Sequence, residues 1–171
     1  MQHSVHPPSA FIRTFTNQLL PSWSDSVKSV LIVLQPSDCD LLEQSPITEQ
    51  QKQRLRERFL EWGKSTADRL QQMGYAADLF DPRTGLPILS LAGSLRLDDV
   101  AVVQSCLGYP TCDRFGCSVI LHPTWGSAVY PSILVSSAPP AKVENLFKQR
   151  SGLDLAAPSE SSDRLLTQPQ P

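Results

Sequence analysis

A long amphipathic helix in the first half of the chain is the feature that most constrains the fold. Residues 48–51, with the sequence TEQQ, match the capping box that opens many helices, and Gly74 follows Met73 where a helix would end. Between these signals, apolar residues recur on one face: Leu55, Phe59, Trp62, Leu70 and Met73. One apolar face needs a second layer to cover it, so we predict a helix over 48–73 packed on a sheet.

The rest of the chain alternates between helix and strand patterns. Residues 27–34 are rich in β-branched side chains and read as a buried, central strand, while 11–20 and 142–150 have helical spacing. Further strands are predicted at 75–80, 117–121 and 127–135, and the last two are expected to pair as a hairpin across 122–126. Residues 98–104 fit a short helix or a strand.

Length and composition limit the domain organisation. A chain of 171 residues is long enough for one domain with a substantial core. We expect that domain over 9–155, between polar, proline-bearing ends at 1–8 and 156–171 that are predicted to be disordered.

Charge and hydropathy exclude several classes of partner. The chain has 15 Lys and Arg against 17 Asp and Glu, so no basic field is expected to attract nucleic acid. The longest apolar stretch, 30–34, is far below the ~20 residues that span a bilayer, and no apolar signal core precedes it. We therefore expect a cytoplasmic protein without a membrane partner. Four cysteines without a secretory signal are expected to be free thiols.

Cys117 is the predicted seat of chemistry. It lies at the start of a β-prone run, and its neighbours Gly116 and Ser118 favour an exposed turn. A thiol there could serve as a nucleophile, a redox group or a soft-metal ligand, and the absence of a nearby base favours the metal role. The alternative is a buried cysteine that packs as a small apolar residue.

Two other interpretations of this region remain open. The spacing C-x5-C-x4-C-x4-H, made by Cys106, Cys112, Cys117 and His122, loosely resembles a zinc site. His122 and Trp125 either pack a turn on the core or form the wall around Cys117. Asp98 and Asp99 are more consistent with a solvated helix cap than with a metal pair. The sequence contains no phosphate-binding glycine loop, nucleophile elbow or H-E-x-x-H pair, so the common enzyme motifs give no support for catalysis.

Two segments carry a resemblance to a known family. Residues 74–86, GYAADLFDPRTGL, and residues 115–126, which begin FGC and end WG, resemble the methylmalonic aciduria and homocystinuria type D protein family of vitamin B12 trafficking chaperones. The similarity runs from about residue 11 to residue 148. It identifies a set of structural motif positions: Asp78, Asp81, Pro82, Gly85 and Gly126.

The resemblance implies a nitroreductase-like α+β fold without flavin, in which helices pack on a central, mostly antiparallel sheet. It implies no enzymatic turnover, a complex with a cobalamin-processing type C-like protein, and ligation of the cobalt of partner-bound cobalamin by Cys117. Gly116, Ser118, His122 and Trp125 would lie nearby. The cargo would pass towards a B12-dependent enzyme such as methionine synthase or methylmalonyl-CoA mutase. The family has two adjacent cysteines where this chain has Cys117 alone.

Two alternatives to this function follow from other features. A flavin-dependent reductase of nitroreductase type would retain the cofactor of the fold, but the sequence has no basic cluster for a flavin phosphate. A small zinc-stabilised interaction domain would use the cysteines named above.

Overall fold

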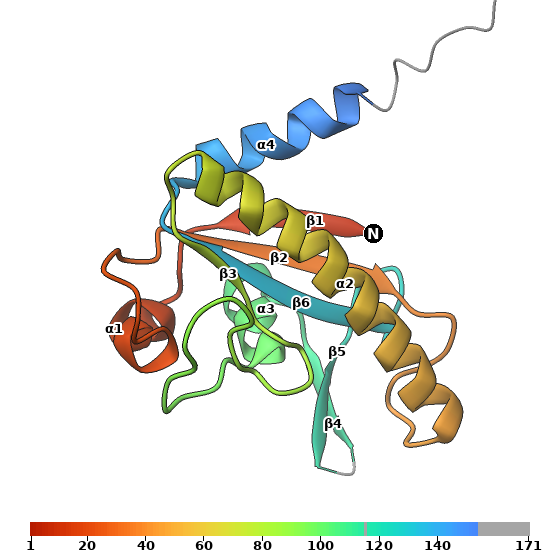
Figure 1. Ribbon diagram of the computed structural model, residues 1–171. Helices are drawn as coiled ribbons and strands as arrows, with labels where there is room; N and C mark the ends of the chain where they lie inside the picture. The colour runs from red at the N-terminus through yellow and green to blue at the C-terminus, as the bar shows by residue number, and fades with distance from the viewer. Residues whose placement is uncertain (115, 154–171) are drawn as a thin grey trace, which may run out of the picture.

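The computed structural model describes residues 1–114 and 116–153, except the side chains of Arg114, Cys117 and residues 148–153 (Figure 1). In chain order its elements are β1 (Gln2–His6), α1 (Ala10–Leu19), β2 (Ser29–Pro36), α2 (Pro46–Gln72), β3 (Ala77–Leu79), α3 (Asp99–Leu107), β4 (Thr111–Arg114), β5 (Cys117–Ile120), β6 (Val129–Ser136) and α4 (Pro140–Leu153). This arrangement confirms the α+β class. The predicted tail at 156–171 lies outside the described residues.

The main sheet has the strand order β1-β2-β6-β3, and every neighbouring pair is antiparallel. The β-branched run in β2 forms an interior strand that is buried up to its last residue, Pro36. Such side chains suit a pleated surface covered on both faces. The central position predicted for 27–34 is confirmed.

The first strand corrects the expectation of a disordered N-terminus. Gln2 pairs with Leu34 and His6 with Val30, so β1 forms an edge of the sheet. Composition reports on side-chain burial, whereas an edge strand is held mainly by backbone hydrogen bonds to its neighbour. A polar sequence can therefore be ordered here.

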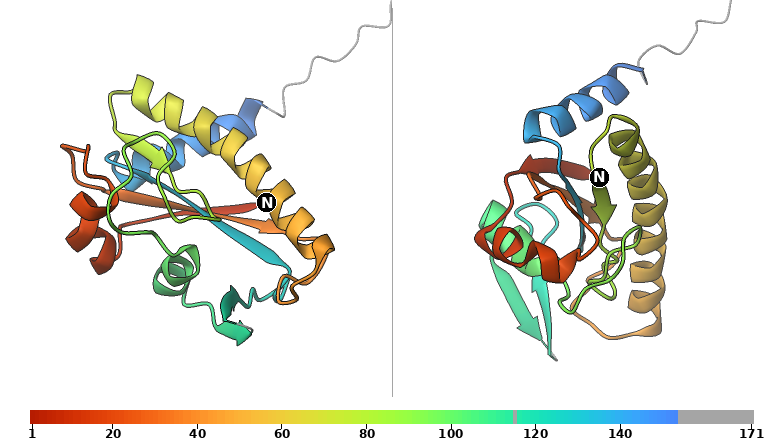
Figure 2. Two further views of the ribbon diagram at one scale, coloured as in Figure 1. Left: turned by 60° about the horizontal axis from the view of Figure 1, so that its bottom comes forward. Right: turned by 60° about the vertical axis from the view of Figure 1, so that its left-hand side comes forward.

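The sheet separates two helical layers (Figure 2). Helices α2 and α4 cover one face, where Leu31 and Val33 of β2 meet Phe59 and Leu146. Helices α1 and α3 cover the other face, where Val30 and Ile32 of β2 lie in one apolar cluster with Ile12 and Val103. Alternate residues of β2 thus supply two cores, as the pleat requires.

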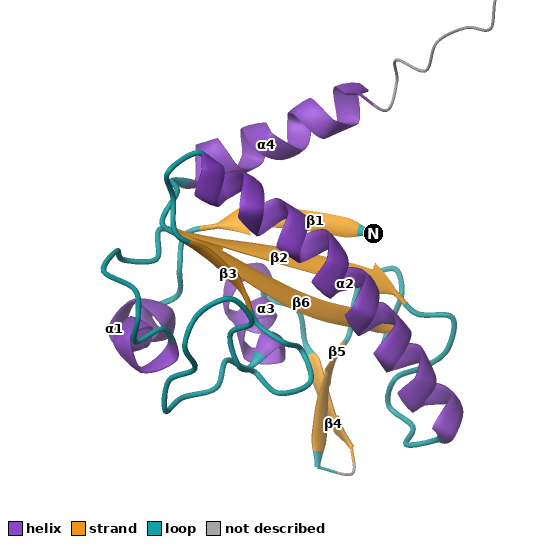
Figure 3. Cartoon of the chain, viewed as in Figure 1, coloured by secondary structure: helices purple, strands orange, loops and turns teal. Residues whose placement is uncertain are grey.

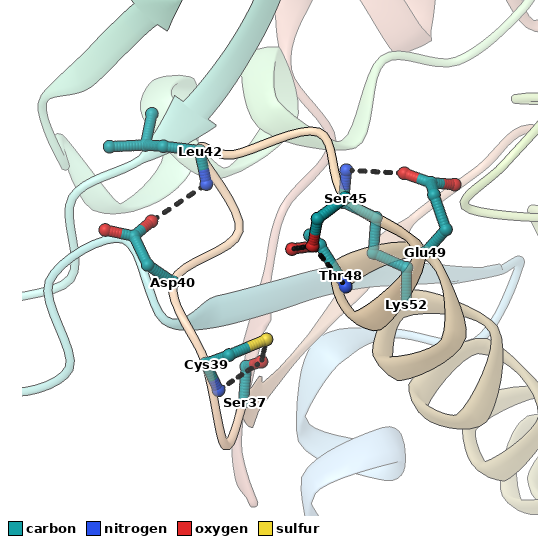
Figure 4. Close-up of polar contacts among 8 residues, drawn as sticks. All are labelled: Ser37, Cys39, Asp40, Leu42, Ser45, Thr48, Glu49 and Lys52. Atoms are coloured by element: carbon teal, nitrogen blue, oxygen red, sulfur yellow. Dashed lines mark hydrogen bonds and ion pairs between the residues drawn. The ribbon is translucent and has the colours of Figure 1, made fainter.

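The long helix α2 begins at Pro46, two residues before the predicted start. Ser45 is the N-cap, and its hydroxyl accepts a 3.1 Å hydrogen bond from the backbone N–H of Thr48 (Figure 4). Pro46 follows the cap, where a proline is well tolerated because the first helical N–H has no partner in the helix. The prediction that residues 48–51 form the capping box is therefore wrong, because the N-cap is Ser45. The predicted end is confirmed, because Gly74 has a φ of 85°.

The buried face of α2 largely follows the predicted periodicity. Leu55, Phe59 and Leu70 are buried, whereas Trp62 is half-buried and Met73 is 49% exposed. Trp62 stacks on Phe147 of α4, with ring centroids 5.6 Å apart. Trp62 thus joins two helices at the margin of the core.

The predicted hairpin between 117–121 and 127–135 is wrong. Strand β5 pairs with β4 in a separate two-stranded sheet, while β6 pairs with β2 on one side and β3 on the other (Figure 3). Both edges of β6 are occupied, so no edge remains for β5. Between β3 and β4, the ambiguous region forms helix α3, which Asp98 caps. No helix among the described residues has the length and apolar character needed to cross a bilayer.

Candidate functional site

The β4–β5 hairpin places Cys117 near a projecting tip. The hairpin extends away from the main sheet, and its turn contains Gly116 at a φ of 78°, a conformation that glycine adopts without steric cost (Figure 1). Cys117 is the first residue of β5 and lies opposite Arg114. Its backbone is described and its side chain is not, so the role of its thiol stays a prediction.

The other cysteines occupy three different environments. Cys112 lies on β4 opposite Val119, and Cys39 lies in the loop after β2, with its sulfur 3.9 Å from the Ser37 hydroxyl (Figure 4). Cys106 on α3 packs against the core, and burial raises the pKa of its thiol. Cys39, Cys106 and Cys112 are all free thiols. The raised pKa makes Cys106 a poor source of the thiolate that binds soft metals.

His122 organises the turn that follows β5. Its Nδ1 accepts hydrogen bonds from the backbone N–H groups of Thr124 and Trp125, at 3.1 and 3.2 Å. Nδ1 therefore carries no proton, and Nε2 donates to Oε1 of Gln2 at 3.1 Å. The ring stacks on Trp125 at 4.1 Å and meets Tyr109 edge-on. Burial lowers the pKa of the imidazole, which favours this neutral state.

The structure does not bring His122 and Trp125 together with Cys117. They follow the base of the hairpin, and the four residues of β5, Cys117–Ile120, span ~13 Å of extended chain. Both ring nitrogens of His122 are already engaged, which disfavours it as a zinc ligand. Among the described side chains, no group of three or more His, Cys, Asp or Glu could hold a metal ion. That search does not cover the Cys117 side chain.

Asp78 fixes the loop that follows β3. Its carboxylate is fully buried and accepts hydrogen bonds from four backbone N–H groups, those of Leu79, Ile88, Leu89 and Ser90, at 2.7–3.1 Å. Backbone donors of this kind stabilise a buried carboxylate without a cation. Asp78 thus acts as an internal anchor for the loop.

Asp81 fixes the next turn to α2. Arg56 donates two hydrogen bonds to its carboxylate, at 2.6 and 2.7 Å, and the backbone N–H of Arg83 donates a third. The Arg56 guanidinium is the main cause of a lowered pKa at Asp81. Gly85 closes the turn with a φ of 68°, and a Cβ at that position would collide with the backbone oxygen of Leu97. Glycine is therefore required at this position.

Arg56 and the turn that Asp81 fixes border a cleft of ≈ 520 Å³ between α2 and β5, called the α2–β5 cleft below. Five of the segments that line it are α2, the turn at 82–85, the start of α3, β5 and β6, represented by Arg56, Arg83, Asp99, Ser118 and Tyr130. The residue after Cys117 is therefore part of its wall. The volume falls in the range of small-molecule sites.

Asp99 is an unpaired acid in this wall. It is 8% exposed, and neither carboxylate oxygen has a hydrogen-bond partner among the described residues. Desolvation, followed by the nearby charges of Asp98 and Asp81, raises the pKa of Asp99 well above its usual value. The expectation of a solvated cap thus holds for Asp98 alone, which accepts from the N–H groups of Val100 and Ala101.

The sequence did not identify this cleft. Arg56 lies on the predicted helix without a motif to mark it, and Tyr130 lies within a predicted strand. The only local signal was the Asp98-Asp99 pair, because two adjacent acids at a helix start cannot both be the cap.

Comparisons with known proteins agree on one family. The family model described as methylmalonic aciduria and homocystinuria type D protein matches residues 3–146. A rat protein (Rattus norvegicus) named cobalamin trafficking protein CblD is 28% identical over 131 residues, which cover 77% of this chain and 44% of the relative. The human protein (Homo sapiens) of the same name is 27% identical over 141 residues, 82% of this chain and 47% of the relative. The chain thus spans about half the length of the curated relatives that it matches.

Proposed function

This chain belongs to the methylmalonic aciduria and homocystinuria type D protein family, and on that premise we propose that it is a cobalamin-trafficking adaptor and not an enzyme. In this role it binds a partner protein that carries cobalamin, and the thiolate of Cys117 ligates the cobalt of that cargo. The name of its relatives, cobalamin trafficking protein CblD, supports cobalamin as the cargo.

The position of Cys117 on the projecting β4–β5 hairpin is the observation that carries this proposal. A ligand near the tip of a hairpin can reach a metal held by another protein, whereas a ligand in the core cannot. A thiolate is a soft donor suited to a transition metal, and a single protein ligand leaves the cargo free to move on.

Further parts of the proposal follow from the family. We infer a single nitroreductase-like, flavin-free domain, located in the cytoplasm, that includes β1 as well as the predicted range 9–155. The partner is a cobalamin-processing type C-like protein, and the recipient is a B12-dependent enzyme such as methionine synthase. The four-stranded antiparallel sheet with helices on both faces supports this fold assignment.

The visible spectrum of cobalamin tests the proposal. We expect the purified chain to shift the spectrum of cobalamin bound to its type C-like partner, because a new axial ligand changes the cobalt centre. Cys117→Ser should abolish the shift, since a hydroxyl does not ionise near neutral pH. Cys112→Ser on the neighbouring strand is the matched control and should leave the shift intact, as should Cys39→Ser.

The outcomes separate the rival functions. If the Cys112→Ser variant loses the shift and Cys117→Ser keeps it, the ligand was assigned to the wrong cysteine of the hairpin. If no cysteine matters, cobalt ligation by this chain is refuted. Stoichiometric flavin released on denaturation would instead favour a reductase, and stoichiometric zinc would favour the interaction domain.

A further inference from the structure

The α2–β5 cleft combines apolar walls with one buried acid. Its apolar lining includes Leu41, Leu97, Val119 and Val129. Asp99 lies in the same wall, is more than nine-tenths buried, and has no partner for either oxygen among the described residues. A buried polar group without a partner is unfavourable, so a ligand that supplies the missing hydrogen bonds gains affinity.

The charges around the cleft indicate which ligand would fit. The Lys52 ammonium lies 3.1 Å from Glu49, and Arg56 is held by Asp81, whereas exposed Arg83 and Arg96 have no ion-pair partner in the described part of the chain. Two unpaired guanidinium groups disfavour a cationic ligand.

The protonation state of Asp99 further limits which chemical class of ligand would fit the cleft. Burial and the neighbouring acids favour its neutral form. A neutral carboxyl group has one donor and one acceptor side by side. Its complement is a primary carboxamide, whose carbonyl accepts the acid proton while its N–H donates to the acid carbonyl.

We propose that the α2–β5 cleft binds a primary carboxamide through the carboxyl group of Asp99, and that this amide belongs to the periphery of the corrin ring. The assignment of the amide to the corrin ring rests on the proposed function, because the corrin ring of cobalamin carries such amides on its edge. Ser118 lines the cleft and directly follows Cys117, so an amide arm of a cobalamin ligated at Cys117 would begin close to the cleft. The oxygens of Asp99 are buried, so binding requires neighbouring side chains to turn aside.

Propionamide is a probe that isolates the amide interaction from cobalt. We expect its addition to the ¹⁵N-labelled full chain to shift the backbone NMR signals of residues around Asp99, Tyr130 and Ser118. Propionate has the same shape but no N–H and a negative charge, and it should not produce this pattern. Asp99→Leu should weaken propionamide binding about tenfold, the loss expected for two neutral hydrogen bonds.

The pH dependence distinguishes an acid–amide pair from simple filling of the cleft. Binding to the wild type should weaken as pH rises through the titration of Asp99. Burial first, then Asp98 at the N-cap of α3 and Asp81 in the facing turn, raise the pKa of Asp99. Tyr130 of β6 and Arg56 of α2 are the other titratable groups that face it across the cleft. Asp99→Asn has nearly the same shape and keeps an amide partner, so its binding should be independent of pH.

Each result bears on one part of the proposal. Equal binding of propionate, or unchanged propionamide binding by Asp99→Leu, would overturn the carboxamide site. Cys117→Ser should leave propionamide binding unchanged, so failure of cobalt ligation does not affect this test. With partner-bound cobalamin, Asp99→Leu should lower the affinity of the chain about tenfold yet retain the spectral shift. If Asp99→Leu binds partner-bound cobalamin with unchanged affinity, the assignment of the amide to the corrin ring is refuted, whereas the proposed trafficking function is not affected.

Discussion

At the residue scale, the turn after β5 depends on a histidine that must stay neutral. Nδ1 of His122 accepts two backbone hydrogen bonds, and a proton on that nitrogen would break both. The folded pKa lies below the ordinary value of 6.5. As pH falls below 6.5 the unfolded chain binds the proton first, so the folded state loses stability until pH drops below the folded pKa.

We therefore predict that the melting temperature falls as pH decreases from 7 to 5, and that His122→Asn reduces this dependence. The asparagine side chain can still accept from backbone N–H groups at this turn but does not titrate. Thermal melts across this pH range provide the measurement. His3 and His6 also have lowered pKa values, so the slope should shrink without vanishing. An unchanged slope in His122→Asn would contradict the role of His122.

The Arg56–Asp81 pair leads to a second prediction at this scale. Its side chains are 22% and 7% exposed, so removing one partner leaves a largely buried charge. Arg56→Met should destabilise the fold by roughly 3 kcal/mol, measured by urea unfolding. Arg54→Met, two residues away on the same helix, is the matched control, because Arg54 is 77% exposed and would lose only its 3.6 Å ion pair with Asp38.

The Arg56–Asp81 pair also makes stability depend on pH, here through protonation of the Asp81 carboxylate. The lowered pKa of Asp81 means that its contribution is present above the ordinary value of 3.8 and is lost as pH falls below it. The destabilisation caused by Arg56→Met should therefore shrink in acid, where Asp81 is protonated and the ion pair no longer contributes. A penalty that stays constant down to pH 3 would show that packing, and not the ion pair, stabilises the turn.

At the element scale, the two aromatic residues of α2 have different roles. Phe59 is 1% exposed in the core, whereas half-buried Trp62 stacks on Phe147 between α2 and α4. We expect Phe59→Ala to cost ~3–5 kcal/mol and Trp62→Ala distinctly less, because less of the indole is removed from water. Denaturant unfolding of both variants measures the difference. A larger loss for Trp62→Ala would mean that docking of α4 dominates the stability of this layer.

At the scale of the whole molecule, the N-terminal strand closes one edge of the sheet. Its residues pair with β2 along its length, and Gln2 also accepts from His122, which joins β1 to the turn after β5. Deletion of residues 1–6 should therefore lower the melting temperature by more than a few degrees. Truncation after Ala157 is the control, which the sequence predicts to be nearly neutral. Equal effects of the two deletions would contradict this role of β1.

The candidate site was only partly predictable from the sequence. The positions of Cys117 in a β-prone run and of Gly85 in a turn follow from local residue preferences. The orphaned acid Asp99 and the clamp between Arg56 and Asp81 join segments that are far apart in the chain. No periodicity or spacing links such residues, so the cleft they border appears only in three dimensions.

The sequence by itself determined the elements whose signals are local. The apolar face of α2, the buried run of β2 and the glycine that ends α2 all follow from spacing and backbone preference within a few residues. Only the tertiary structure decided which strand edges meet. It paired β5 with β4, because β6 is occupied on both sides, and it ordered a polar N-terminus against β2. Backbone hydrogen bonding is nearly independent of side-chain identity, so strand partners depend on the edges that the whole fold leaves free.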